Sequence, residues 1–481
     1  MSPTPRRTAI RAGWVIAFDG RGHRLLRDGV VVVEGDRILH VGPRFEGAAD
    51  ETVEARDRVL TPGLISTHAH IGGSPLDRSF IEDRGTPQFF YSGLFEMLPV
   101  RGGAQDEEAG RACVDFSMAE LLRGGCTTVM EIGGLGEYVV ERAAHYGLRV
   151  YMGLAFRSGR WLTRDGKRVE WGWDAAAGRK GLERAVEFHK RYDGAHGDLV
   201  RCFFSPAQID TCTPELLREA KRWADETRRP YQVHASQSVV EFYEMLGRHG
   251  TTPIAWMREL GILGPTVILG HAIIVGGSSW TNYPAGDIRI MGDAGCSVAH
   301  AVWVFARRGV AMESFARYKT AGVNMSLGTD TNPQSVIEAM RWAAVVSKMM
   351  ERNTQATSAA DAFDAATLGG ARALGRDDLG RIAPGAKADL VLWKGASWNM
   401  TPLRDPVKNI VYSATSEDVD RVWVDGRLVV DGGRVLAADE AGILAALQAG
   451  GERMWPRMGR FDWAGRGADG LSPQTYPEWP A

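Results

Sequence analysis

The sequence is poor in cysteine, with only five in 481 residues. They are scattered and odd in number, and no two of them form a C-x-x-C pair: Cys113, Cys126, Cys202, Cys212 and Cys296. A disulfide framework usually has an even set of cysteines. The pattern therefore favours a reduced, cytoplasmic protein over a disulfide-bonded one.

Long apolar runs and an excess of one charge are also missing. The apolar stretch nearest the N-terminus, Val30 to Val33, is far shorter than the about 7–15 residues of a signal peptide or the about 20 of a membrane span. The formal net charge of −2 indicates no strong attraction to nucleic acid or to an anionic membrane. We therefore expect a small-molecule substrate and neither a nucleic-acid nor a membrane partner.

What the sequence does have is length and two β-rich ends. A chain of this length can hold a barrel of roughly 250 residues and a smaller module. Short β-rich runs separated by turn signals fill the first part, and similar runs return at Asp389–Trp393 and from Arg421 onward. We predict three parts: a small β-sandwich domain from residues 1–61 and 378–437, a (β/α)8 TIM barrel from residues 62–377, and a C-terminal helix and tail at residues 438–481.

The middle of the chain alternates between strand-like and helix-like segments. The predicted strands are Leu60–Thr67, Cys126–Ile132, Arg149–Leu154, Leu199–Ser205, Tyr231–His234, Thr266–His271, Gly295–Ala299 and Val323–Thr329. Helical spacing of apolar residues marks the stretches between them, such as Glu215–Glu226 and Ser335–Met350. The alternation predicts an α/β fold with parallel strands, either a barrel or an open sheet. The residues that end the strands favour the barrel.

Four histidines and one aspartate end predicted strands. His68 and His70 follow the first strand, and two residues apart on a strand point to the same side. His234 ends the fifth strand, His271 the sixth and Asp330 the eighth. The carboxyl ends of barrel strands meet at the face where active sites form, and imidazole nitrogen with carboxylate oxygen suits Zn²⁺ and other first-row divalent ions. We therefore predict a metal site.

Three segments carry a resemblance to a known family. They are Pro62–His70, Gly328–Asn332 and the stretch from Leu379 to Leu392, and in them, together with His234 and His271, the chain resembles the amidohydrolase superfamily. The resemblance implies a barrel, a β-sandwich from both termini, hydrolysis at carbon centres and a homo-oligomer. Two-metal members usually have a lysine at the end of the fourth strand, whereas residues 202–215 have none. This implies the single-metal branch of cytosine, guanine and triazine hydrolases, with one ion, Zn²⁺ foremost and Fe²⁺, Mn²⁺ or Co²⁺ as alternatives, held by His68, His70, His234 and Asp330.

Each site residue has an expected role in this chemistry. A metal ion lowers the pKa of bound water, and Asp330 can take the proton and pass it to the leaving group. His271 is expected to hydrogen-bond the water or a substrate carbonyl. The expected substrate-binding residues are His300, Trp303, Phe305 and Asn332, and the aromatic ones favour a hydrophobic, aryl-type substrate.

One position departs from the ring deaminases of this branch. These enzymes usually carry Glu three residues after the fifth-strand histidine, where this chain has Gln237. Glutamine can hydrogen-bond but cannot exchange a proton at neutral pH. The sequence therefore favours a non-peptide amide, urea or carbamate, whose carbonyl needs no ring protonation, with Gln237 as a catalytic hydrogen-bonding group. Two alternatives stay open, a ring deaminase or dehalogenase of a triazine- or pyrimidine-like heterocycle and a silent ligand-binding barrel. Glu241 is read as a solvated helix residue, with a stand-in acid as the alternative.

The first prediction concerns the number of ions. Protein loaded with a divalent metal should hold about one equivalent per chain, because the ligand set lacks a bridging lysine. Elemental analysis checks this number, and a reproducible second equivalent would contradict it. His68→Ala or His70→Ala should remove most of the metal and most of the activity.

Overall fold

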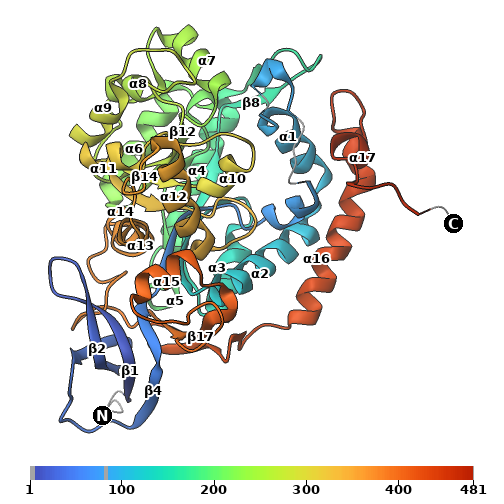
Figure 1. Cartoon of the computed structure of the whole chain (residues 1–481). Coiled ribbons are helices and arrows are strands. Elements are labelled where there is room, and N and C mark those ends of the chain that lie inside the picture. The colour runs from blue at the N-terminus through green and yellow to red at the C-terminus, as the bar shows by residue number, and fades with distance from the viewer. Residues whose placement is uncertain (1–5, 81–84, 91, 480–481) are drawn as a thin grey trace.

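The computed structural model describes residues 6–80, 85–90 and 92–479. It has a large part in which parallel strands alternate with helices and a small sheet formed by both ends of the chain (Figure 1). The predicted α/β class is confirmed.

The large part contains two parallel sheets. One has the order β10-β7-β6-β5, with β11 beside β7, and the other has the order β12-β13-β14-β15. Their bounds are β5 Leu64–Ala69, β6 Cys126–Gly133, β7 Arg149–Phe156, β10 Val200–Cys202, β11 Ser205–Pro206, β12 Tyr231–Ala235, β13 Val267–His271, β14 Ser297–His300 and β15 Asn324–Leu327. Parallel bridges from Phe204 to Tyr231 and from Ala69 to Asp330 join the sheets at both edges. The strands therefore follow one another in a ring.

Helices cover the outside of this ring. The main ones are α2 Glu107–Arg123, α3 Gly136–Tyr146, α4 Ala175–Tyr192, α6 Pro214–Thr227, α7 Val239–His249, α8 Pro253–Glu259, α9 Asp287–Asp293, α11 Phe315–Thr320, α12 Val336–Glu351 and α13 Ala359–Asp364. The predicted helices at Glu215–Glu226 and Ser335–Met350 correspond to α6 and α12. The hydroxyl of Thr213 accepts from Leu216 N, which starts α6 with a side-chain cap. β12 and β13 are buried along their whole length, as expected for strands that are covered by helices on one face and by the interior of the ring on the other.

The first predicted strand, Leu60–Thr67, is two strands. β4 (Glu51–Pro62) belongs to the small sheet, and β5 begins after Gly63. A Cβ on Gly63 would lie 2.0 Å from Oγ1 of Thr127, so only glycine fits where the chain passes from one sheet to the other. Both strands are apolar here, so the hydrophobic pattern of the sequence does not mark the boundary between β4 and β5.

The small sheet is continuous across both ends of the chain. Its order is β19-β18-β17-β16-β4-β1-β2-β3. The remaining bounds are β1 Arg7–Phe18, β2 His23–Glu34, β3 Arg37–Gly42, β16 Leu390–Lys394, β17 Val419–Val424, β18 Arg427–Asp431 and β19 Arg434–Val435. Ile10, Val31, Leu390 and Trp423 meet in one apolar cluster, so strands from distant parts of the sequence share a core.

A buried ion cluster joins the small sheet to the large part. Arg149 at the start of β7 is fully buried and pairs with Asp389 and Asp425, from the segment before β16 and the β17–β18 turn. Asp389 also accepts from the backbone N–H of Asp425 at 2.8 Å. These groups lie at the amino ends of the parallel strands, opposite the histidines.

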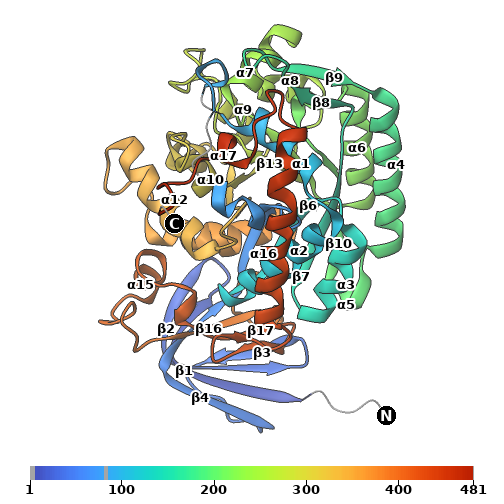
Figure 2. The same cartoon turned by 90° about the vertical axis from the view of Figure 1, so that its right-hand side faces the viewer.

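The C-terminal segment lies along the outside of the large part. α16 (Glu440–Met454) runs from beside the small sheet to α1 (Leu94–Ala104), and η6 (Trp455–Arg460) and α17 (Ala468–Leu471) follow it (Figure 2). A short hairpin, β8 Gly159–Leu162 with β9 Glu170–Trp173, packs on the other side of α1. In the described ranges, no helix has the length and apolar character needed to cross a membrane. All five cysteines are buried and free.

We expect Arg149→Met to lower the free energy of unfolding by about 3–5 kcal/mol, because it leaves the buried Asp389 without its cationic partner and Asp425 with Lys387 alone. Denaturant unfolding measures the change. Arg421→Met is the matched control, since its partner Asp431 is partly exposed and the pair should contribute less than about 1 kcal/mol. Equal effects of the two variants would contradict the structural role of the cluster.

Candidate metal centre and its cavity

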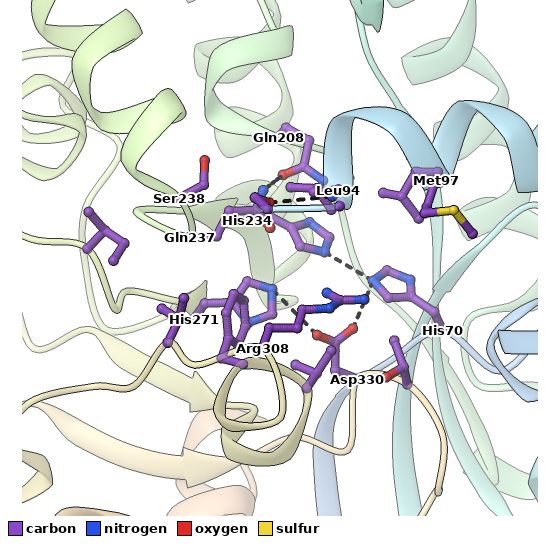
Figure 3. Close-up of a pocket in the computed structure, with 18 of the residues that line it drawn as sticks. His70, Leu94, Met97, Gln208, His234, Gln237, Ser238, His271, Arg308 and Asp330 are labelled. Carbon is purple, nitrogen blue, oxygen red and sulfur yellow. Dashed lines mark hydrogen bonds and ion pairs between the residues drawn. The ribbon is translucent and has the colours of Figure 1, made fainter. Parts of the chain in front are cut away.

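The four histidines and the aspartate predicted from the strand ends lie together. Asp330 Oδ1 lies 3.7 Å from Nε2 of His68 and 3.6 Å from Nε2 of His70. Asp330 Oδ2 lies 3.9 Å from Nε2 of His271. His234 Nε2 lies 3.1 Å from His70 Nε2. Figure 3 shows His70, His234, His271 and Asp330 pointing toward one common space.

Hydrogen bonds at Nδ1 fix three of the rings. His68 Nδ1 lies 2.9 Å from Oε1 of Gln232, and His70 Nδ1 lies 2.9 Å from the carbonyl oxygen of Ile132. The Nδ1 of His234 bonds to the carbonyl oxygen of Ala207. An oxygen of this kind only accepts, so each Nδ1 carries the proton and each Nε2 presents a lone pair to the centre.

These lone pairs fit a metal ion. The Nε2 atoms of His70 and His234 face each other as two acceptors, and Nε2 of His68 is buried without a hydrogen-bond partner. Two sets of ligand atoms each lie within 4.8 Å: His68, His70 and His234, and His68, His271 and Asp330. Nitrogen and carboxylate ligands in such sets are typical of zinc sites.

Burial keeps three of the imidazoles neutral, those of His70, His234 and His271. It lowers the pKa of His70 to about 4, against the opposing effect of the Asp330 carboxylate. Burial also lowers the pKa of His234 and His271 well below the usual value, and the neighbouring imidazoles add to the shift. At neutral pH these rings are therefore in the form that binds metal.

Backbone strain gathers at the same place. The φ angles of Ser236, His271 and Asp330 are +56°, +84° and +58°. Residues other than glycine rarely adopt this left-handed backbone conformation, and those that do cluster at functional sites.

A cavity of about 230 Å³ opens above the cluster. Its apolar lining includes Phe89, Leu94, Met97, Ile274 and Phe305. Two amides face this lining, and Gln237 Nε2 donates to Gln208 Oε1 (Figure 3). The cavity can hold a small, largely apolar molecule next to the histidines and Asp330.

Only one of the four predicted substrate-binding residues is among the described residues that line the cavity. Phe305 lines the cavity, whereas the lining residues of the described chain do not include His300, Trp303 or Asn332. Trp303 lies on α10 (Val302–Ala306) and packs against Trp342 at 5.1 Å. Asn332 Nδ2 donates to the carbonyl of Ser74 at 2.8 Å. Substrate contact by His300, Trp303 and Asn332 stays a prediction that their placement does not support.

The interpretation of Glu241 as a solvated residue is wrong. Its side chain is fully buried, and its carboxylate accepts from the backbone N–H groups of Ser236 and Gln237. Burial and the nearby Asp210 raise its pKa, against the backbone hydrogen bonds. Glu241 thus supports the turn that carries Gln237, and it is not among the residues that line the cavity.

Some residues of the site were missed in the sequence. Gln232 lies two residues before His234 on β12, so period-two spacing could have placed it beside the histidines. Gln208 follows β11, and no spacing from a strand-end histidine in the sequence indicated that it belongs to the site. Arg308 was also missed, and Figure 3 shows its side chain beside Asp330.

Comparisons with known proteins point to one family. The model of the amidohydrolase family matches residues 59–429. A 5′-deoxyadenosine deaminase of Methanothermobacter thermautotrophicus is 28% identical over 430 residues, covering 88% of this chain and 94% of that protein. A 5-methylthioadenosine/S-adenosylhomocysteine deaminase of Desulforudis audaxviator is 28% identical over 459 residues, covering 93% and 99%.

Solved structures show the same similarity in three dimensions. An adenosine deaminase from Xanthomonas campestris with bound zinc superposes with a TM-score of 0.81 at 25% identity, covering 94% of this chain and 99% of that one. An atrazine chlorohydrolase from Arthrobacter aurescens TC1, complexed with zinc, gives 0.79 at 22% identity, covering 92% and 100%. The latter is a likeness of fold.

We expect Gln232→Leu to weaken metal binding by about 10–100-fold, because His68 loses the acceptor that orients its ring. Competition with a chelator measures the affinity. Asn324→Leu is the matched control, since this buried amide on β15 bonds to Ser297 and Gly369 and not to a histidine. Unchanged affinity in the Gln232 variant would contradict the role of this bond.

Proposed function

Because this chain belongs to the amidohydrolase family, we propose that it is a hydrolase that uses water to displace an exocyclic group from a nitrogen-containing aromatic ring. One observation supports this most strongly. The histidines and Asp330 lie below a cavity whose walls combine apolar side chains with the amides of Gln208 and Gln237. Apolar walls suit a flat ring, and the amides can hydrogen-bond ring nitrogens.

The comparisons favour a ring over a carbonyl substrate. The sequence alone favoured an amide, urea or carbamate. The relatives that match nearly the whole chain are deaminases of 5′-deoxyadenosine and of 5-methylthioadenosine/S-adenosylhomocysteine. Hydrolytic deamination of adenine adds water at a ring carbon. We therefore place this chain with the ring hydrolases.

We propose that His68, His70, His234 and Asp330 hold one divalent ion, with zinc as the first candidate. Their Nε2 and carboxylate oxygen atoms lie close enough together, and their chemistry suits this metal. The ion, when bound, supplies a hydroxide-like nucleophile at neutral pH.

The protein's own groups then manage the protons. The water oxygen becomes bonded to the ring carbon, and Asp330 accepts the proton of the water. Asp330 passes this proton to a departing amine, whereas a departing halide leaves without it and the proton goes to solvent. His271, neutral and within 3.9 Å of Asp330, donates a hydrogen bond that orients the attacking oxygen. This assignment fits the position of both residues at the base of the cavity.

Gln237 sets the choice of leaving group. It can hydrogen-bond a ring nitrogen but cannot protonate it. Addition of water then depends on the electron deficiency of the ring itself, which rises with the number of ring nitrogens. We propose an electron-poor ring bearing apolar substituents, and a leaving group such as halide that departs without a proton.

A second candidate function rests on the same residue. An amide, urea or carbamate carbonyl needs no ring protonation, and Gln237 can stabilise its developing oxyanion as a hydrogen-bond donor. A panel of matched chloro- and amino-substituted rings together with anilides and ureas tests both. Hydrolysis confined to the carbonyl compounds would overturn the ring proposal.

We also propose that the ring of parallel strands is a closed (β/α)8 barrel formed by residues 62–377. Residues 1–61 and 378–437 would form a small β-sandwich, and residues 438–481 a C-terminal helix and tail. The bridges at both sheet edges and the shared core of the small sheet support this division. Assembly into a homo-oligomer is a further proposal from the family.

We expect Gln237→Glu to raise the release of ammonia from an amino-substituted ring by up to about 100-fold, because it introduces a general acid. The same variant should slow hydrolysis of a carbonyl substrate by placing negative charge near the oxyanion. Steady-state assays of ammonia release and of carbonyl hydrolysis measure both rates.

Gln237→Met separates the loss of the amide from the gain of an acid. Gln237→Met should release halide from a chloro-substituted ring more slowly than the parent enzyme. Gln237→Glu should release ammonia from an amino-substituted ring faster than the parent enzyme. If all three proteins release ammonia at one rate, Gln237 does not contact the ring and the leaving-group proposal is wrong.

A further inference from the structure

Helix α1 has two faces with different neighbours. Leu94, Met97, Leu98 and Arg101 follow helical spacing and line the cavity. Glu96, Val100 and Gly103 follow the same spacing on the opposite side, about 200° around the helix axis. This side faces the C-terminal segment, defined here as residues 454–471. The helix therefore lies between the cavity and that segment.

The sequence of α1 is a weak helix former. Pro99 lies inside it, and Gly102 and Gly103 follow close to its end. An internal proline removes one backbone hydrogen bond, and each glycine costs about 1 kcal/mol relative to alanine. A short helix of this composition depends on tertiary packing for its position.

A buried carboxylate ties α1 to the C-terminal segment. The carboxylate of Glu96 is almost completely buried, with 2% of the side chain exposed. Its Oε1 accepts from Trp463 Nε1 at 2.9 Å and from Arg466 Nη2 at 2.9 Å. Arg466 is itself held by two oxygens of Asp462, at 3.0 and 2.7 Å. A buried carboxylate needs hydrogen-bond partners, and charge-assisted hydrogen bonds have a preferred geometry. The contacts of Glu96 with Trp463 and Arg466 therefore fix the position of α1 relative to the C-terminal segment.

Close packing adds to the charged link. A Cβ on Gly103 would lie 2.3 Å from the ring of Phe461, so the backbone of α1 lies directly against this residue. Val100 and Ala104 belong to one apolar cluster with Met454, Met458 and Leu471. The two segments therefore share a core although more than three hundred residues separate them.

We infer that the C-terminal segment is a specificity element, which positions the α1 wall of the cavity through the contact of Arg466 and Trp463 with Glu96. Arg466 acts here as a positioning residue, since it does not line the cavity. The inference rests on the proposed function in one respect, that the cavity is where substrate binds.

The test compares Arg466→Met with Arg460→Met in the full-length, metal-loaded enzyme. Arg460 is exposed in the same segment, and no hydrogen bond or ion pair joins it to α1 among the described residues, so its variant controls for the loss of one charge. Hydrogen–deuterium exchange of the backbone amides of residues 94–104 measures how firmly α1 is held in place, and it needs no substrate. We expect exchange about tenfold faster in the Arg466 variant and unchanged in the control.

Kinetics then test the effect on specificity. With any substrate that the parent enzyme hydrolyses, KM should rise about tenfold in Arg466→Met while kcat and metal content stay near the parent values. Trp463→Phe, which removes only the indole N–H, should give a smaller rise, and Arg466→Lys should restore part of the loss.

The outcomes separate this inference from the proposed function. Unchanged exchange of α1 overturns the inference whatever the substrate is. Faster exchange with unchanged KM also overturns it, because the wall would then not affect binding. If no ring compound is hydrolysed, the proposed function fails, but the exchange experiment still decides whether the C-terminal segment positions α1.

Discussion

The site depends on the hydrogen bonds that hold the Nδ1 atoms of three histidines. Each bond crosses from one strand to another. His68 on β5 bonds to Gln232 on β12, His70 directly after β5 bonds to Ile132 on β6, and His234 on β12 bonds to Ala207 beyond β11. The Nε2 atoms of these histidines therefore point inward only when β5, β6, β11 and β12 lie in their correct order. The candidate metal site therefore forms only in the folded chain, and a metal ion that binds these nitrogens would also stabilise the strand arrangement.

Stability and chemistry lie at opposite ends of the parallel strands. Arg149 and its carboxylates join the small sheet at the amino ends, away from the histidines. A buried ion pair of this kind contributes less to stability than its removal costs, because the cost comes from the charges left behind. The cluster joins the small sheet to the amino ends, whereas the strained residues His271 and Asp330 lie at the carboxyl ends. The unfavourable backbone conformations of His271 and Asp330 persist because the surrounding structure holds them in place.

The sequence could predict what depends on local pattern. Alternation and strand ends place His68, His70, His234, His271 and Asp330 at one face, because a parallel strand brings its last residue to a known edge. Period two could also have placed Gln232. The cavity wall was not predictable in this way. Trp303 turns toward Trp342 because its segment forms a short helix. Helix α1 is hidden by its proline and glycines, and its position comes from residues at the far end of the chain.

The position of Glu241 shows why nearness in sequence is a poor guide to an acid's role. Glu241 is one helical turn from Gln237, yet its carboxylate points to the backbone N–H groups of Ser236 and Gln237. These bonds and its complete burial keep it away from the cavity. Rotating it inward would leave two buried N–H groups unpaired, at a cost of about 1–3 kcal/mol each. The acid nearest in sequence to Gln237 therefore holds the turn, and the amide of Gln237 lines the cavity. In the function that we propose, proton transfer is assigned to Asp330, because its carboxylate lies among the imidazoles.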